Sequence, residues 1–512
     1  MKNILYIVIF VLMAVNMLPS CTNLDETIYS ELESDSFYTN ESEMIMSVGQ
    51  LYTYAQGWCN YLSVLGALLI SSDEAICPYR EGGLWWDNGD WITLHTHEFN
   101  SYSDVLKRSW DYFFSGISKC NQVLYTMEQS TTNFETKLNL IAEVKVMRAW
   151  FYMNAMDMFG DVPLTTDFRD TELHARTPRK EVYDFIEKEF KDNVDLLPQH
   201  QTPSNIGRPT QAMAYTCLAK LYLNAKEWAE SERWQECVDA CDKIINMNAF
   251  ELENDYFANF AVNNENSKEN IFVIVYDNAR MGDTGRGFNH VLLLHQYTLH
   301  SLSQETFNIT DFCWDGFAAT ESLWKSYDEK DIRRNSWLEG LQYASNGAPL
   351  MITNDRQLNY RPEIRSLGDG REGFALVDDG VRLCKYEYEK NLQGSMSNDW
   401  VVYRYADILM MKGEALVRLN KASEALPYFN KIRERAGVFD YKESDLTLDE
   451  ILAERSREFA WECLRRQDLI RFDKWGNAWD FKPVSSSNKK LFPIPNQALN
   501  TNPNLVQNEG YN

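Results

Sequence analysis

A pair of amphipathic helices joined by a short polar break constrains this fold more than any other stretch of the sequence. The pair runs from Tyr403 to Gly437, and each half carries apolar residues at three- and four-residue spacings, which is typical of helices that face a core. Asn420 and Lys421 separate the halves, and Gly437 is a usual residue type just past a helix end. We therefore expect two antiparallel helices in contact.

This hairpin is similar to a tetratricopeptide unit, and Gly413 and Ala425 are small where the two helix backbones would approach. Such a unit cannot bury its apolar face alone, so other hairpins should pack against it. Helical periodicity recurs over residues 41–56, 61–70, 110–124, 136–159, 209–247 and from Leu448 to about Trp475. We predict a mainly α fold, in which tetratricopeptide-like hairpins form a scaffold over about residues 36–250 and 400–475.

A different pattern separates the two parts of the scaffold. Between about residues 250 and 400, asparagine, glycine and aromatic residues dominate, and 271–276 is a candidate strand. We expect a loop-rich insert with a few short strands and a helix over 318–327, and an extended tail over 476–512. Residues 71–103 lack any period and contain glycines and a proline, which predicts a further long loop. Long loops in compact proteins are usually functional.

The N-terminus carries the signature of an exported protein. One lysine precedes an apolar run from Ile4 to Val15 that is short for a membrane span, so residues 1–20 are predicted to be a signal peptide. The sequence Leu-Pro-Ser-Cys that ends at Cys21 resembles the lipid-attachment sequence of bacterial lipoproteins. Cys21 would then carry acyl chains such as palmitate, and two or more chains anchor a protein stably. A plain secretory signal followed by a chance cysteine is the alternative.

Net charge and cysteine spacing argue against binding to nucleic acid, to anionic lipid surfaces and to a metal ion. The chain has 75 acidic and 50 basic residues and a net charge of −25, which disfavours nucleic acid and anionic lipid surfaces as partners. Of its ten cysteines, nine remain besides Cys21, so at least one is unpaired or pairs between chains. Cys237 and Cys241 lie four residues apart in a helical pattern, which favours buried thiols over a metal pair.

Several segments together resemble the SusD/RagB family of surface lipoproteins that bind nutrient glycans. They occur in the family's order and span nearly all of residues 21–512, which would form a single domain. One local departure is Cys463, followed by Gln467, where relatives more often have a glycine and an aromatic residue. The similar segments are Arg148–Phe151, Gly160–Leu164, Gly207–Thr210, Arg404–Leu409, Glu454–Arg455 through Trp475, Phe492–Pro495 and Asn502–Tyr511.

The resemblance implies a function as well as a fold. It implies a non-catalytic protein that is lipid-anchored on the outer face of the outer membrane and captures oligosaccharides or polysaccharides. It also implies a partner, a SusC-like TonB-dependent transporter, to which the glycan is delivered. Two other readings stay open: a tetratricopeptide-type adaptor that binds protein, and a surface glycosidase, because carboxylates are too numerous to exclude a catalytic pair by counting.

Glycan binding requires flat apolar faces for sugar rings and polar side chains for their hydroxyls, and aromatic residues supply such faces. Three tryptophans, Trp85, Trp86 and Trp91, lie within seven residues of one glycine-rich loop. Relatives often place a stacking tryptophan here, so Trp86 and then Trp85 are favoured. Any one of these rings could instead anchor the loop to the core. The polar candidates beside them are Asp73, Arg80 and Asn88.

The insert supplies the second set of candidates, because relatives contribute further stacking aromatics from about this region. We select Tyr297 and Trp314, with Trp337 as a weaker third. The alternative for Trp314 is that it packs at the start of the helix over 318–327.

Metal and catalytic sites find less support. His95 and His97 alternate in one segment, but no third histidine-rich motif accompanies them, so a hydrogen-bonded structural pair is favoured. Residues 87–90, Asp-Asn-Gly-Asp, lack the later glutamate of a calcium loop. No nucleophile elbow or zinc-protease motif occurs. We predict no metal, no cofactor and no enzymatic activity, although a structural calcium ion is compatible with residues 87–90.

Overall fold

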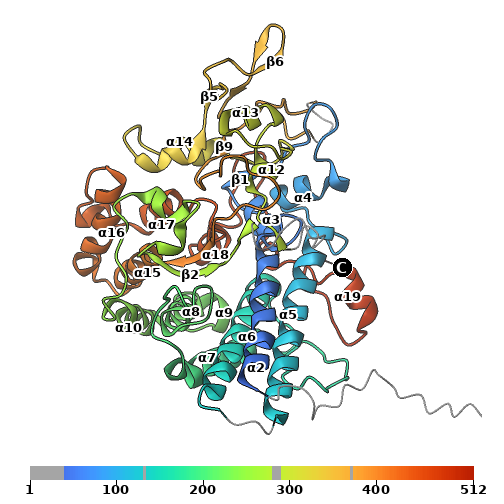
Figure 1. Ribbon diagram of the computed structural model, residues 1–512, viewed down its shortest axis with the longest axis vertical. Coiled ribbons are helices and arrows are strands. Elements are labelled where there is room, and N and C mark those ends of the chain that lie inside the picture. Colours follow the sequence, from blue (N-terminus) through green and yellow to red (C-terminus); the bar gives the residue numbers. More distant parts are fainter. Residues whose placement is uncertain (1–39, 131–133, 279–289, 369–372, 512) are drawn as a thin grey trace, which may run out of the picture.

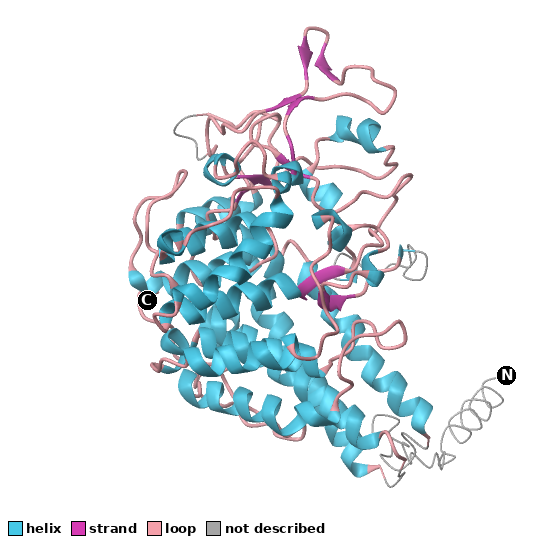
Figure 2. Ribbon diagram, turned by 90° about the vertical axis from the view of Figure 1, so that its left-hand side faces the viewer, coloured by secondary structure: helices cyan, strands magenta, loops and turns pink. Residues whose placement is uncertain are grey.

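A helical body carries a loop-rich region at one end (Figures 1 and 2). The computed structural model describes residues 40–130, 134–278, 290–368 and 373–511. The predicted signal peptide and Cys21 lie outside the described residues. Short strands gather in the loop-rich region, and the hairpin of β6 (Met351–Thr353) and β7 (Arg356–Gln357) projects from its end (Figure 1).

The body is a stack of helical hairpins, as the periodicity predicts. α5 packs on α6, α6 on α7, α8 on α10, α10 on α15 and α15 on α16. The fold is therefore mainly α and tetratricopeptide-like, which confirms the predicted class. The helices of the stack are α2 (Glu41–Ala55), α5 (Asp104–Gln129), α6 (Lys137–Phe159), α7 (Arg179–Asn193), α8 (Gln211–Leu223), α10 (Trp234–Ile245), α15 (Tyr405–Arg418) and α16 (Ala422–Ala436).

The two helices of the α15–α16 hairpin are in close contact, as the small residues Gly413 and Ala425 predict. A Cβ built on Gly413 would lie 2.5 Å from the Phe429 ring, a distance that real contacts do not reach. Phe429 and Ala425 are fully buried, so the ring has no room to withdraw. Gly437 ends the hairpin in the left-handed conformation, with φ of 75°.

Shorter helices and two-stranded antiparallel ladders build the rest. The remaining α-helices are α3 (Val64–Ile70), α4 (Asp90–Thr96), α9 (Ala225–Ala229), α12 (Leu294–Thr298), α13 (Gln304–Phe307), α14 (Glu321–Lys325), α17 (Leu448–Phe459), α18 (Arg465–Arg471) and α19 (Asn496–Thr501). The ladders join β1 (Ala75–Ile76) to β3 (Ala318–Ala319), β2 (Asn270–Ile274) to β10 (Trp400–Arg404), β4 (Trp337–Leu338) to β9 (Arg382–Leu383), β5 (Gly340–Leu341) to β8 (Asn359–Tyr360), and β6 to β7.

Three local predictions are wrong. The helix expected from Leu448 to about Trp475 is two helices, α17 and α18, because Trp461 and Cys463 take left-handed backbone angles (φ 61° and 63°). The loop expected over residues 71–103 contains α4, since Trp91 and its neighbours bury an apolar face. The helix expected over 318–327 is only α14, because Ala318 and Ala319 pair with β1 instead.

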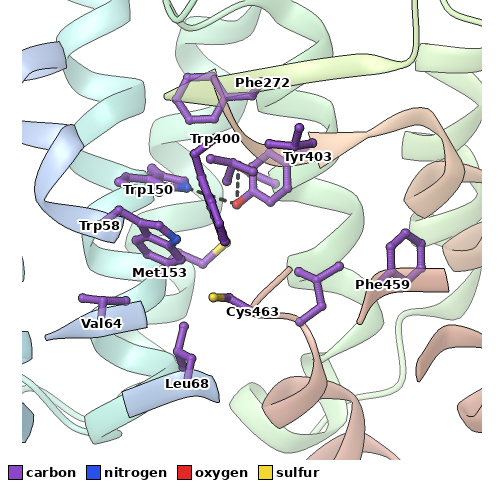
Figure 3. Packing of buried hydrophobic residues seen from close by; sticks show 14 of the residues in the cluster. Trp58, Val64, Leu68, Trp150, Met153, Phe272, Trp400, Tyr403, Phe459 and Cys463 are labelled. Atoms are coloured by element: carbon purple, nitrogen blue, oxygen red, sulfur yellow. Dashed lines mark hydrogen bonds between the residues drawn. The ribbon is translucent and has the colours of Figure 1, made fainter. Parts of the chain in front are cut away.

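The core lies where the helical stack meets β2 and β10 (Figure 3). Trp58 packs on Trp150 with ring centroids 5.0 Å apart, and the Trp150 indole donates a hydrogen bond to Tyr403 Oη at 3.1 Å. The nine cysteines of the described residues are all free thiols, and all but Cys384 are buried. Cys237 and Cys241 are thus buried thiols, as expected.

A buried group of charged side chains, termed here the ion cluster, fastens the helices to the insert. Arg404 at the end of β10 contacts Glu269 at 2.7 Å, Glu458 at 2.5 Å and Glu462 at 2.8 Å. Because these carboxylates come from before β2, from α17 and from the break after α17, one guanidinium links three segments. The cluster consists of Arg333, Lys385, Arg404, Arg435, Glu269, Asp331, Glu454, Glu458 and Glu462.

The ion cluster makes stability depend on pH in the acid range. Burial alone would raise the pKa of Glu454, but Arg333 of the cluster and the adjacent Arg457 and Arg433 outweigh it and lower that pKa from 4.5 to about 2. A carboxyl with a lowered folded pKa stabilises the protein above its unfolded pKa, and this stabilisation is lost as pH falls toward the folded pKa. Urea unfolding should therefore give a free energy of unfolding lower by about 3 kcal/mol or more at pH 2 than at pH 6. Equal free energies at the two pH values would contradict this.

Candidate ligand-binding site

The tryptophan loop, residues 79–89, is held by backbone pairing to a distant segment. The Tyr79 amide donates to Leu367 O at 3.0 Å, and the Glu81 amide donates to Ala375 O at 2.8 Å. Within the loop, Trp85, Asp87 and Asn88 have φ of 64°, 36° and 56°, a region that non-glycine side chains rarely adopt. Such strain is concentrated at functional sites in proteins. Here it accompanies two neighbouring indoles in different surroundings, one packed inward and one exposed.

Trp86 is the exposed indole. Its side chain is 48% exposed, and its ring lies 5.3 Å from the ring of Tyr79. Tyr79 in turn meets Phe374 edge-on at 4.9 Å, and Phe374 is 54% exposed. Gly89 packs beneath Trp86, since a Cβ built there would lie 3.6 Å from the ring. Tyr79, Trp86 and Phe374 form a supported, outward-facing surface that we call the aromatic shelf.

Trp85 packs inward and is half-buried. Its Nε1 donates to the carbonyl oxygen of Trp314 at 2.6 Å. Gly316 is required beneath it, because a built Cβ would lie 2.3 Å from the indole. Trp314 is also half-buried, and both rings lie beside the half-buried Tyr61, at 5.7 and 6.1 Å.

Four of the residues predicted to contact the ligand are buried in this structure. We therefore do not propose them as ligand contacts. Trp91 is 1% exposed and donates from Nε1 to Asp87 at 2.6 Å. Tyr297 is fully buried against Phe317. Arg80 is fully buried, where its guanidinium donates to the backbone oxygens of residues 316, 376 and 379. Trp337, the weaker candidate, is also buried.

The two polar candidates differ. Asp73 accepts two hydrogen bonds from the Arg465 guanidinium, at 2.6 and 2.7 Å, so its carboxylate is occupied by an internal ion pair. Asn88 is exposed at the turn after Trp86. Of the predicted residues, Trp86 and Asn88 are thus exposed and Trp85 is half-buried. Trp91 and Arg80 hold the loop in place, and Asp73 is paired with Arg465 of α18.

Sequence reasoning missed two of the three rings of the shelf. Tyr79 and Phe374 are far apart in the chain and belong to no motif, so only the pairing of residue 79 with residue 375 brings them together. The same pairing brings polar groups near. Arg356 bonds Glu81 at 3.3 Å and Asp378 at 2.6 Å, and Arg365 is 42% exposed beside the buried Asp378 and Asp379.

The histidine pair is structural, as predicted. The His95 ring contacts the carbonyl oxygens of Ala75 and Asp480 at 3.2 and 2.6 Å. Burial lowers the pKa of His97 to about 2, so its imidazole stays neutral while it bonds the Ser71 carbonyl at 2.8 Å. Over the ranges that the structure describes, no group of three or more His, Cys, Asp or Glu side chains is arranged to hold a metal ion. Over the same ranges, no helix combines the length and apolar character of a membrane span.

Comparison with known proteins places this geometry in a family. The family model described as "SusD family" matches residues 248–511, and the one described as "Starch-binding associating with outer membrane" matches residues 24–223. The starch-binding protein SusD of Bacteroides thetaiotaomicron is 24% identical over 469 residues, which cover 83% of this chain and 82% of that protein. A SusD-like protein of Bacteroides ovatus is 23% identical over 466 residues, which cover 86% of this chain and 77% of that protein.

Solved structures share the whole fold. Surface glycan-binding protein A from Bacteroides thetaiotaomicron, in complex with laminarihexaose, superposes with a TM-score of 0.73 at 22% identity, and the match covers 91% of this chain and 99% of that one. A laminarin-binding SusD-like protein superposes with a TM-score of 0.75 at 20% identity, over 93% and 100% of the two chains. The relatives are thus SusD-like glycan-binding proteins, and the chain described here belongs to the SusD family.

Proposed function

We propose that this protein binds an oligosaccharide or polysaccharide on the aromatic shelf and does not cleave it. The observation that carries the proposal is the exposure of Trp86 and Phe374, 48% and 54%, on rings that are held by Tyr79. Exposed rings that gather in one patch mark binding sites, whereas single exposed rings are common on protein surfaces. Rings fixed before binding also lose little entropy when a sugar ring stacks on them.

The polar surroundings of the shelf suit sugar hydroxyls. The exposed Asn88 amide and the half-exposed guanidiniums of Arg356 and Arg365 supply donors, and Glu81 supplies an acceptor. Trp85 and Trp314, which are half-buried at the inner side of the loop, are also proposed to contact the ligand. The names of the relatives, which include a starch-binding and a laminarin-binding protein, support a glycan as the ligand.

Membrane attachment and transport complete the proposal. Cys21 would be lipidated and hold the protein at the cell surface, on the outer membrane, and the bound glycan would pass to a SusC-like TonB-dependent transporter. The family description of association with the outer membrane supports this location. Loss of membrane attachment in a Cys21→Ala strain would support the anchor, whereas an unchanged membrane fraction would contradict it.

Trp86→Ala should weaken glycan binding by about 1–2 kcal/mol, a rise in Kd of roughly 5-fold to 30-fold, because a central stacking ring is removed. Isothermal titration with the glycans that a binding array identifies provides the measurement, and the same mixtures analysed for products test for cleavage. Phe439→Ala is the matched control: Phe439 is 83% exposed and lies after α16, outside the shelf, so binding should be unchanged. Equal affinities of the Trp86→Ala variant and the natural protein would remove the shelf from the site.

A further inference from the structure

A concave surface made of other residues than the aromatic shelf lies where α2 ends and α3 and α5 begin. This hollow, termed the α2–α5 groove, has a volume of about 320 Å³. That volume lies at the lower end of the ~300–1,000 Å³ of ligand pockets, so it suits one or two sugar units rather than a long chain. Eight residues of its wall enter the argument: Tyr54, Asn60, Ser63, Asp104, Lys107, Arg108, Asp111 and Tyr112.

Ser63 in this wall has an unused hydroxyl. It stands directly before α3, where serine normally caps a helix, but its side chain makes no capping hydrogen bond, and its backbone (φ −140°, ψ −128°) departs from a usual cap. Ser63 is 3% exposed, and its Oγ has no hydrogen-bond partner within the described part of the chain. An unsatisfied buried hydroxyl costs free energy, and a ligand hydroxyl in the groove would satisfy it.

The rest of the wall suits a neutral ligand with a flat face. The rings of Tyr54 and Tyr112 stack at 5.5 Å with an interplanar angle of 9°, and Tyr54 is half-buried and lines the groove. Burial raises the pKa of Tyr54, so its phenol stays neutral. The wall's charges form two pairs along α5, Asp104 with Arg108 at 2.8 Å and Lys107 with Asp111 at 2.6 Å. Paired charges attract neither anions nor cations strongly, but they offer many donors and acceptors.

We propose that the α2–α5 groove is a second carbohydrate subsite, in which a neutral, polyhydroxylated sugar unit stacks on Tyr54 and bonds Ser63 Oγ through a hydroxyl. The assignment of a sugar to this groove rests on the proposed function, because the groove would bind the same class of ligand as the aromatic shelf. The groove is nevertheless built from residues that the shelf does not use. Tyr61, between Asn60 and Ser63 in the chain, contacts Trp85 at 5.7 Å and so links the groove to the tryptophan loop.

The test is a calorimetric titration of the purified protein and its variants with neutral trisaccharides of glucose, mannose, galactose and xylose. In a Trp86→Ala background, which removes the shelf, a residual binding event should remain. Adding Ser63→Ala should raise the Kd of that event threefold to tenfold. Hydrogen exchange of residues 54–63 should slow with the saccharide in the Trp86→Ala variant, and this protection should be lost in the double variant.

The variants are chosen so that folding does not obscure the result. Removing an unsatisfied buried hydroxyl is neutral or stabilising, so Ser63→Ala should leave Tm unchanged or slightly higher. Ser109→Ala is the matched control: Ser109 is buried in α5, but its hydroxyl already donates to Val105 O at 2.9 Å, so residual binding should not change.

The outcomes separate the two proposals. No residual binding after Trp86→Ala, or residual binding that Ser63→Ala leaves untouched, overturns the groove and leaves the shelf intact. If Trp86→Ala does not weaken binding, the proposal for the shelf is overturned, and the effect of Ser63→Ala on binding then tests the groove. Failure of the natural protein to bind any of the four trisaccharides would overturn the groove, whereas the shelf is tested separately with the glycans that the binding array identifies.

Discussion

Replacing Arg404 by methionine is expected to destabilise the protein by about 3–5 kcal/mol, a large part of the ~5–15 kcal/mol that stabilises a typical domain. Arg404 is buried and contacts Glu269, Glu458 and Glu462. Its loss leaves the negative charges of these buried carboxylates only partly compensated. Removing one partner of a buried ion pair costs more folding free energy than replacing the whole pair by apolar residues, because the remaining charge is left buried. Urea unfolding, followed by circular dichroism, measures the effect as a lower midpoint.

A double variant identifies the cause of that loss. If uncompensated charge is responsible, Arg404→Met combined with Glu462→Gln should recover part of the stability, because one of the stranded carboxylates is removed. Arg169→Met is the control, since Arg169 forms an exposed pair with Asp167 and should leave the midpoint unchanged. If Arg404→Met unfolds at the same urea concentration as the natural protein, the ion cluster does not fasten the insert to the helices.

The helical body could be predicted from the sequence because amphipathic periodicity is a local signal. The stretch 136–159 and the observed α6 differ by one residue, and Gly160 ends the helix with φ of 78°. The break after α17 could not be predicted in this way. Trp461 and Cys463 are poor turn formers, and their left-handed backbone is accompanied by the burial of Glu462 between Arg404 and Lys385. Cys463, where relatives more often have glycine, was the one available hint.

The candidate site was predictable only in part, for a related reason. Composition indicates that a loop with three tryptophans is functional, but it does not say which indole faces outward. That choice depends on the left-handed angle at Trp85 and on Gly316 and Gly89, against which the two neighbouring indoles pack. Phe374 lies in the shelf because the adjacent Ala375 pairs with the backbone of Tyr79 and Glu81, and no local sequence pattern predicts this pairing. Ser63 was missed because a serine before a helix reads as an ordinary cap.

Gly66→Ala should be the most damaging single methyl group that can be added near the site. A Cβ built on Gly66 in α3 would lie 1.8 Å from the backbone oxygen of Tyr61 and 3.0 Å from the Trp91 ring. Backbone cannot rotate aside as a side chain does, so the Tyr61 segment must shift. Alanine gains about 1 kcal/mol in helix propensity over glycine, but overpacking against backbone should exceed the usual ~1–3 kcal/mol. We expect a net loss of about 3 kcal/mol.

The matched control is another helical glycine with the opposite expectation. Gly49 in α2 has no atom within 4 Å of a built Cβ, so Gly49→Ala should raise stability by about 0.5–1 kcal/mol. The two substitutions add the same methyl group to helices, and only the surroundings differ. Since Tyr61 contacts Trp85 and lies between two residues of the α2–α5 groove, Gly66→Ala should also weaken glycan binding in the folded fraction. Equal unfolding midpoints for the two variants would mean that the close approach of α3 to Tyr61 does not exist in solution.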